Sequence, residues 1–267
     1  MAIALGQLTP VELGFGESAI SLAATGGSWT VNSGRRAAHG IGLRVPFDSI
    51  ETNCTMSMTV DFFVYYDADL ATALGLINSE AATALTTCWL ITGTTKISGK
   101  MSALSLKCSL EEELSGSITI EGDTLSTEAA PTAPTAGDLF DPSTIVFANL
   151  GTAVKASTFD LSVTNAITPR RYMTAVRTPA ALAEGKQVIT FSMNMLEIPS
   201  VPSDITAAGI TVAAPTVAIT DTNDSAKTLT ITFANALPTS QSGTLNVDDL
   251  LEHGIEYGAE TVSFGVA

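Results

Sequence analysis

The sequence lacks long apolar runs. No run of about 18 apolar residues occurs, so we expect no membrane-spanning helix. The first ten residues, M-A-I-A-L-G-Q-L-T-P, hold no basic segment followed by an apolar core, so we expect no secretory signal. These two absences together predict a protein made in the cytoplasm.

Cysteine and histidine are also scarce. The three cysteines, Cys54, Cys88 and Cys108, show no metal-ligand spacing, and we expect them to be buried free thiols in a reducing compartment. The only histidines are His39 and His253, and no nucleophile elbow, phosphate loop, dinucleotide fingerprint or zinc-protease motif occurs. The sequence therefore predicts no enzyme, metal or cofactor. A hydrolase with a triad assembled in space remains the enzymatic hypothesis.

Positive charge is the third shortage. The chain holds 12 Lys and Arg against 27 Asp and Glu, for a net charge of −15. Such a surface repels phosphate, so we do not expect sequence-specific DNA binding. The simpler explanation of this acidity is that it keeps the protein soluble. The functional explanation is that it lets DNA pass along the protein without binding to it. The 45% hydrophobic content nevertheless suits a packed core rather than disorder.

The sequence does contain many segments in which apolar and polar residues alternate, as on half-buried strands. Helical spacing occurs over Asp67–Asn78, which predicts the main helix, and more weakly over Val247–His253. The expected strands are Thr55–Tyr66, Thr87–Thr92, Met101–Leu110, Leu114–Glu121, Ile145–Phe147, Thr158–Thr164, Ile189–Met195, Thr211–Thr220, Lys227–Phe233 and the chain end over Thr261–Val266.

About eight or nine of these strands are amphipathic, since Ile145–Phe147 is short and Thr211–Thr220 is irregular, and the absence of a strand–helix–strand rhythm predicts a mainly antiparallel fold. We expect one β domain over residues 1–267, a barrel or sandwich with a short helix packed on its side and long loops. Residues 1–30 are rich in Gly, Ser and Ala and predict an extended arm with at most short strands. Residues 122–143 are rich in proline and predict a surface loop.

The stretch from Ser157 to Ile198 joins two alternating strands through a connection with three of the chain's 12 cations, Arg170, Arg171 and Arg177. In so acidic a chain, this local concentration of arginines predicts a site of contact with another surface. A solvated loop is the alternative. A second local group of cations contains Arg35 and Arg36.

Negative charge is concentrated between two of the expected strands. Glu111, Glu112 and Glu113 separate Met101–Leu110 from the alternating run that follows. Two such runs predict an antiparallel hairpin with the acidic residues at or near its tip. A solvated turn is the simpler explanation of these three carboxylates.

Three parts of the sequence resemble the major tail tube proteins of long-tailed phages. In that family a strand ending in Asn leads through a Pro- and Arg-bearing connection and a Gly-bearing turn into a long strand. Here this part reads F-D-L-S-V-T-N-A-I-T-P-R-R-Y-M and P-A-A-L-A-E-G-K-Q-V-I-T-F-S-M. The other parts are the hairpin K-M-S-A-L-S-L-K-C-S-L-E-E-E-L-S-G-S-I-T-I-E-G and the late strand K-T-L-T-I-T-F-A-N-A-L-P. Residues 199–226 resemble an insertion in this pattern.

The resemblance implies a β-barrel or sandwich subunit that assembles into stacked hexameric rings in the virion tail, after synthesis in the host cytoplasm. The rings enclose an acidic lumen through which genomic DNA passes without specific binding, and the candidate lumen residues are Glu111, Glu112 and Glu113. The candidate contacts between subunits are Arg35, Arg36, Arg170, Arg171 and Arg177. The other implied partners are the tail terminator and tape measure proteins.

One alternative to the tail tube comes from a different functional class. An immunoglobulin-like or adhesin-type sandwich that binds a receptor or decorates a virion would share the same alternating strands. Its discriminating property is that it remains a monomer at high concentration.

Overall fold

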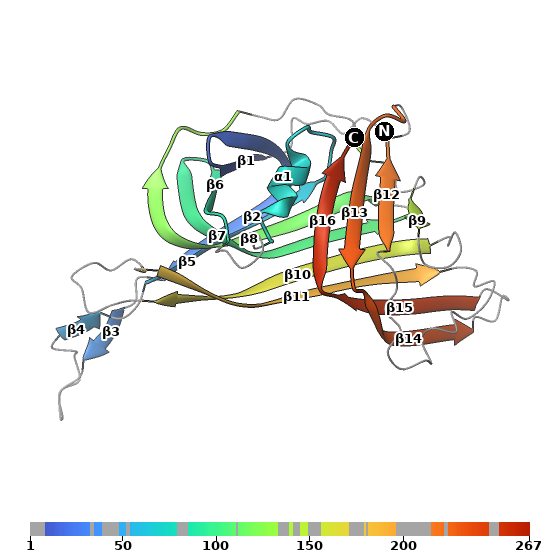
Figure 1. Ribbon diagram of the computed structural model, residues 1–267. Helices are drawn as coiled ribbons and strands as arrows, with labels where there is room; N and C mark the ends of the chain where they lie inside the picture. Colours follow the sequence, from blue (N-terminus) through green and yellow to red (C-terminus); the bar gives the residue numbers. More distant parts are fainter. Residues whose placement is uncertain are drawn as a thin grey trace.

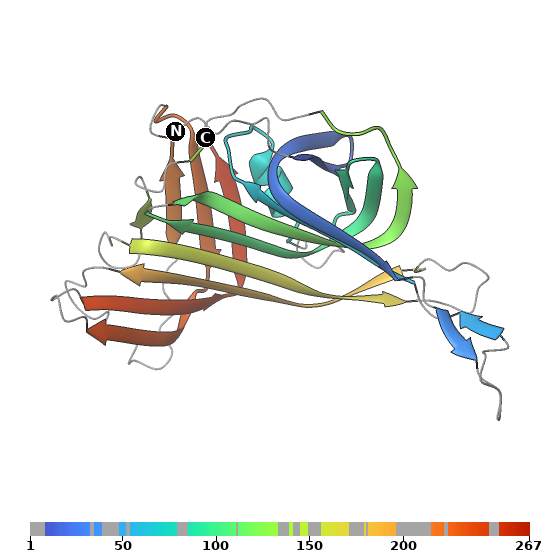
Figure 2. The same cartoon turned by 180° about the vertical axis from the view of Figure 1, so that it is seen from behind.

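We analysed a computed structural model that describes residues 9–32, 35–38, 48–51, 54–78, 85–110, 112–132, 139–140, 145–148, 156–170, 179, 181–195, 215–221, 224–245 and 251–267. The fold is mainly β, with antiparallel pairing and one short helix in the described residues (Figures 1 and 2). Within this part of the chain, no helix is long and apolar enough to cross a lipid bilayer.

Most strands belong to one ten-stranded sheet with the order β14-β15-β11-β10-β7-β6-β1-β2-β5-β8. Because β8 also pairs with β7, six of these strands pair in a closed circuit, from β7 through β6, β1, β2, β5 and β8. The bounds are β1 (Thr9–Phe15), β2 (Ser18–Asn32), β5 (Thr55–Phe63), β6 (Cys88–Thr92), β7 (Thr95–Ser109), β8 (Glu112–Thr127), β10 (Ala156–Arg170), β11 (Ala181–Met195), β14 (Leu237–Leu245) and β15 (Leu251–Ala259).

A second sheet of four strands has the order β16-β13-β12-β9. Its strands are β9 (Val146–Ala148), β12 (Thr216–Thr220), β13 (Thr228–Ala234) and β16 (Thr261–Val266). Phe191 of β11 joins the two sheets, because its ring stacks on Phe233 of β13 at 4.0 Å between centroids and on Tyr257 of β15 at 4.8 Å. A separate hairpin of β3 (Arg35–Ala38) and β4 (Asp48–Glu51) extends away from both sheets (Figure 1).

The alternation of apolar and polar residues along the strands places the apolar side chains in the core. On β7, Leu104 and Leu106 are buried, while Ser105 is half-buried and Lys107 is exposed on the opposite face. The helix α1 (Leu70–Gly75) buries Leu70, Ala73 and Leu74 against the same core. Because the buried apolar residues of both sheets and the helix form one contiguous cluster, the described residues share one core.

The strands and the helix that were predicted from a clear periodicity of apolar residues are confirmed. The strand expected over Thr55–Tyr66 is β5, the helix expected over Asp67–Asn78 contains α1, and the hairpin expected from Met101 is β7–β8. The two strands expected within Ser157–Ile198 are β10 and β11, which pair as an antiparallel hairpin. The strand expected at the chain end is β16.

The prediction for residues 1–30 is wrong over residues 9–30, and residues 1–8 lie outside the described part. β1 and β2 form a hairpin that is central to the large sheet, and Val11, Leu13, Ile20 and Leu22 are buried. Apolar residues do alternate over Val11–Phe15 and Ile20–Leu22, but both runs are short, and the pattern changes beyond the register shift between Ala24 and Gly26.

The other differences lie at segment ends. Leu251–His253 begins β15 instead of ending a helix, whereas the expected helix start at 247–250 lies outside the described residues. Residues 122–127 continue β8 instead of opening a loop, while most of 133–143 is not described. In the proposed insertion, residues 199–214 lie outside the described part, but β12 contributes Val217 and Ile219 to the core.

Candidate functional site: the polar face and the two ends of the large sheet

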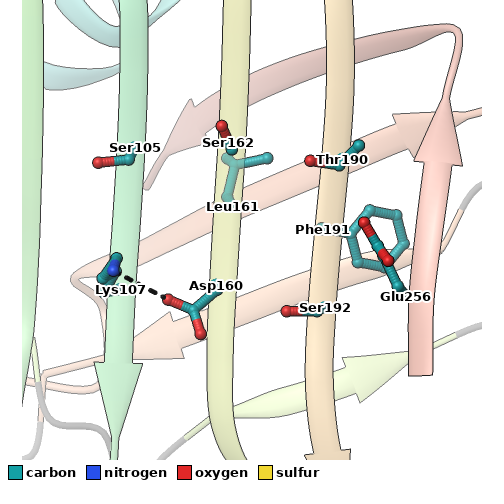
Figure 3. A pocket seen from close by; sticks show the side chains of 9 residues that line it. All are labelled: Ser105, Lys107, Asp160, Leu161, Ser162, Thr190, Phe191, Ser192 and Glu256. Carbon is teal, nitrogen blue, oxygen red and sulfur yellow. Dashed lines mark ion pairs between the residues drawn. The ribbon is translucent and has the colours of Figure 1, made fainter. Parts of the chain in front are cut away.

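The outward face of β7, β10, β11 and β15 carries mostly small polar side chains. In one row across the sheet Lys107, Asp160, Ser192 and Glu256 lie opposite one another in register. The next row is Ser105, Ser162 and Thr190 (Figure 3). These residues line a shallow hollow of about 490 Å³, and the intervening Leu161 and Phe191 are buried on the other face. The sheet thus presents a broad hydroxyl-rich surface.

The charges on this face are few and exposed. Lys107 Nζ lies 3.9 Å from Asp160 Oδ1, and side-chain exposures of 70% and 50% make this a weak ion pair. Ser240 Oγ donates a hydrogen bond of 3.0 Å to Glu256 Oε2. Because Asp160 and Glu256 outnumber Lys107, the lined hollow has a surplus of negative charge. Such a surface hydrogen-bonds water and repels phosphate.

The chemistry of the described residues offers little for catalysis or metal binding. No group of three or more His, Cys, Asp or Glu side chains within the described ranges is arranged to hold a metal ion. Cys54, Cys88 and Cys108 are buried and none of them forms a disulfide in the described part of the chain. Burial raises the pKa of Cys88 to about 12, although a backbone hydrogen bond at Met101 opposes that shift, so its thiol is a poor nucleophile at neutral pH.

The described members of the two predicted arginine groups are Arg170 on β10 and Arg35 and Arg36 on β3. Arg170 is the last residue of β10, paired with Ala181 and exposed. Figures 1 and 2 show that this end of the β10–β11 hairpin and the β3–β4 hairpin extend to the same side of the molecule. β3 begins with Arg35 and Arg36, whose side chains lie outside the described part, as do Arg171 and Arg177. Arg170, Arg35 and Arg36 therefore belong to two hairpins at one end, where β4 also carries Asp48 and Glu51.

The expected basic connection is shorter than predicted. Pairing of β10 with β11 continues past an irregularity at Asn165 and includes Pro169 and Arg170. Proline is tolerated here because β7 pairs with β10 only as far as Thr164, which leaves no strand within the described residues to require the missing N–H.

The acidic residues lie on the β7–β8 hairpin, near the opposite end of β10. Glu112 and Glu113 open β8 directly after the hairpin turn, where Leu110 N–H donates to Ser157 O at 3.1 Å. Ser157 stands at the start of β10 and Arg170 at its end, so the two charged ends are about 40 Å apart at the usual rise per strand residue. Glu112 is exposed and Glu113 is half-buried, while Glu111 lies outside the described residues.

The sequence prediction missed the acidic residues of the face itself. Asp160 occupies an outward position in a strand that was correctly predicted, so its alternation could have indicated it. Glu256 lies in β15, for which no strand was expected, and only the pairing of β11 with β15 places it beside Ser192.

Side-chain amides attach the helix to the β10–β11 hairpin. Asn165 Nδ2 donates to Ile77 O at 2.7 Å and to Met101 O at 3.1 Å, and Gln187 Nε2 donates to Ile77 O at 2.9 Å. Asn78 Nδ2 in turn donates to Val262 O of β16 at 2.8 Å. The Ile77 carbonyl lies just past the C-terminal end of α1, where no further helical N–H follows, and Asn165 and Gln187 satisfy it. The Asn that carries part of the family resemblance therefore fixes the hairpin to the body.

Glu184 of β11 makes a second attachment. Its carboxylate accepts hydrogen bonds from Lys100 Nζ and from the Leu85 N–H, the latter at 2.8 Å. Burial acts to raise the pKa of Glu184, but the two hydrogen bonds and the charge of Lys100 outweigh it, and the pKa falls below its usual value of 4.5.

Glu184→Gln should lower the free energy of unfolding by about 1–2 kcal/mol at pH 7. A lowered folded-state pKa stabilises the fold fully above the unfolded value of 4.5, and this stabilisation is lost as the pH falls through the folded pKa. Denaturant unfolding at several pH values should therefore show the two proteins converging in acid. The matched control is Glu128→Gln, which removes an exposed ion pair with Lys96. An equal effect of both substitutions, or one independent of pH, would contradict this role for Glu184.

Comparison with protein-family models and with curated proteins found no match to the sequence. The functional argument therefore depends on the residues and on the geometry described above.

Proposed function

We propose that the chain is a structural subunit of the tail tube of a long-tailed phage, which assembles into stacked hexameric rings around an acidic-lined conduit for DNA. In this proposal the six-stranded circuit and the two packed sheets are a barrel-and-sandwich fold of the tail-tube type. The subunit joins the virion tail after synthesis in the host cytoplasm, and its other partners are the tail terminator and tape measure proteins.

The observation that carries the proposal is the separation of charge along β10. Arg170 ends this strand, and Glu112 and Glu113 begin β8 near its other end. Opposite charges at opposite ends favour a head-to-tail contact, in which the basic end of one copy meets the acidic end of the next. A contact between two different surfaces of the same chain can repeat without limit and builds a stack.

The polar face provides the second support. Its small hydroxyl side chains and its surplus of carboxylates suit the wall of a conduit, because phosphates are repelled and no cluster of cations retains them. We assign Asp160 and Glu256 to this wall. Glu112 and Glu113, at the strand ends, fit the contact between successive copies better than the lumen that the sequence had suggested.

The proposal predicts that the purified chain assembles by itself. Size-exclusion chromatography with mass detection, followed by negative-stain microscopy, should show rings or tubes as the protein concentration rises. A protein that stays monomeric at high concentration would contradict the proposal and favour a receptor-binding or decoration protein.

A further inference from the structure

Two large apolar side chains are exposed close to the charges of the proposed head-to-tail contact. Trp29 and Leu110 are each 51% exposed. Leu110 lies in the turn between β7 and β8, two residues before Glu112, and its N–H is held by Ser157 O. Trp29 lies near the end of β2, six residues before Arg35.

The end of β2 lies on the same side of the molecule as Arg170. Figures 1 and 2 show that β2 extends toward the β3–β4 hairpin, which lies on the side reached by the distal end of β10. Six extended residues span at most about 20 Å, so Trp29 cannot be far from Arg35. Trp29 therefore belongs to the Arg170 end of the subunit, and Leu110 belongs to the Glu112 end.

The indole of Trp29 is exposed although it projects from the core-facing side of the sheet. Met58 of β5 lies directly opposite Trp29 and is fully buried, and opposed residues of antiparallel strands project to the same face. β1 pairs with β2 only as far as Ala24, so among the described strands none adjoins Trp29 on its second side. Gly27, the preceding residue on this face, adds no side chain beside the ring. An apolar group from outside can therefore reach the indole.

The charged contact alone would be weak. Exposed ion pairs contribute little free energy, and complementary charge mainly orients the partners and speeds their encounter. Interfaces obtain most of their affinity from a few side chains that are fully removed from water, and Trp is among the most frequent of these. Trp29 and Leu110 are placed to supply such an apolar centre, one from each end of the subunit.

We propose that Trp29 of one copy packs against Leu110 of a second copy, with Arg170 facing Glu112 and Glu113 at the rim of the contact. The occupant is a second copy because the end that carries Leu110 also carries the carboxylates complementary to Arg170. This inference rests on the proposed function and names the residues that give the head-to-tail contact its affinity. The charges then determine its orientation.

Tryptophan fluorescence tests this contact directly. The chain has two tryptophans, so Trp89→Phe leaves Trp29 as the only indole. In the dilute subunit Trp29 should emit as a water-exposed indole and be quenched by acrylamide. On assembly its emission should shift to shorter wavelength and its quenching should fall. Unchanged emission in the assembled protein would overturn the inference and leave the proposed function intact, and an indole already shielded in the dilute subunit would show that this chain covers Trp29 itself.

Truncation of each residue tests whether the two touch. Trp29→Ala and Leu110→Ala should each raise the concentration needed for assembly about tenfold or more, with little change in melting temperature. The double variant should be little worse than either single variant, because one truncation already removes the shared contact. Val146→Ala is the matched control, since Val146 is 55% exposed on β9 of the second sheet, and it should assemble as the wild type does.

The outcomes separate this inference from the proposed function. Additive losses in the double variant would show that Trp29 and Leu110 do not contact each other. If both single variants assemble at the wild-type concentration, the apolar contact is wrong although self-assembly remains. If the wild type never assembles, the proposed function fails and this inference fails with it. Should a truncated variant unfold, the emission of Trp29 in the Trp89→Phe protein decides.

Discussion

Reversing the charge at either end of the β10 strand should raise the concentration needed for assembly about tenfold or more. Arg170→Glu combined with Arg171→Glu would place negative charge against Glu112 and Glu113 of the next copy. Like charges brought together at an interface cost several kcal/mol, and about 1.4 kcal/mol already corresponds to a factor of ten. Because Arg170 is exposed and Glu112 lies at a strand end, the subunit itself should remain folded.

Mixing two complementary variants gives the decisive form of this experiment. The first variant carries Arg170→Glu and Arg171→Glu, and the second carries Glu112→Lys and Glu113→Lys. Neither should assemble alone, because each brings like charges together at every contact. An equimolar mixture should assemble, since the altered ends pair with each other and the unaltered ends also pair.

The matched control is Lys107→Glu, which reverses a charge on the polar face away from both ends and should leave stacking intact. Analytical ultracentrifugation of each variant and of the mixture gives the readout. Assembly of each variant alone at the wild-type concentration would show that these charges do not form the contact. If the mixture does not assemble although circular dichroism shows that both variants are folded, the conclusion is the same.

Phe191→Ala should strongly destabilise the folded subunit. The Phe191 side chain is 1% exposed and stacks on rings from both sheets, Phe233 at 4.0 Å and Tyr257 at 4.8 Å. Truncation of such a residue removes its burial and leaves a cavity between the layers. The expected loss is about 3–5 kcal/mol in the free energy of unfolding.

Denaturant unfolding of the wild type and of Phe191→Ala measures this loss directly. Val188→Ala is the control, because Val188 lies on the same strand but is 47% exposed, so its truncation should change stability by less than about 0.5 kcal/mol. A loss below about 1 kcal/mol for Phe191→Ala would mean that the two sheets do not depend on this aromatic stack.

Alternation in the sequence predicted the strands whose two faces differ clearly. Met56, Met58 and Val60 on β5 are buried opposite Ser57 and Thr59, and the pattern is visible without any structure. β14 could not be recognised in this way, because it lies at an edge and its sequence is largely polar. Its partner β15 combines glycine with charged residues, and the apolar Leu251 before Glu252 and His253 resembled the end of a helix.

The candidate site was predictable only in part. The local concentrations of charge that contain Arg170 and Glu112 could be recognised from the residue types alone. It could not indicate that the β3 hairpin, which begins at Arg35, extends to the same end as Arg170, because more than a hundred residues separate them and only the topology relates them. The polar face depends likewise on the lateral pairing of β11 with β15, which brings Glu256 next to Ser192.

A density map of the assembled protein tests the central claim most directly. We expect successive copies to contact head to tail, with the Arg170 end of one copy against the Glu112 and Glu113 end of the next. The hydroxyl-rich face of β10 and β11 should be turned toward a central channel. A map in which like ends meet, or in which this face is turned outward away from any channel, would contradict the account.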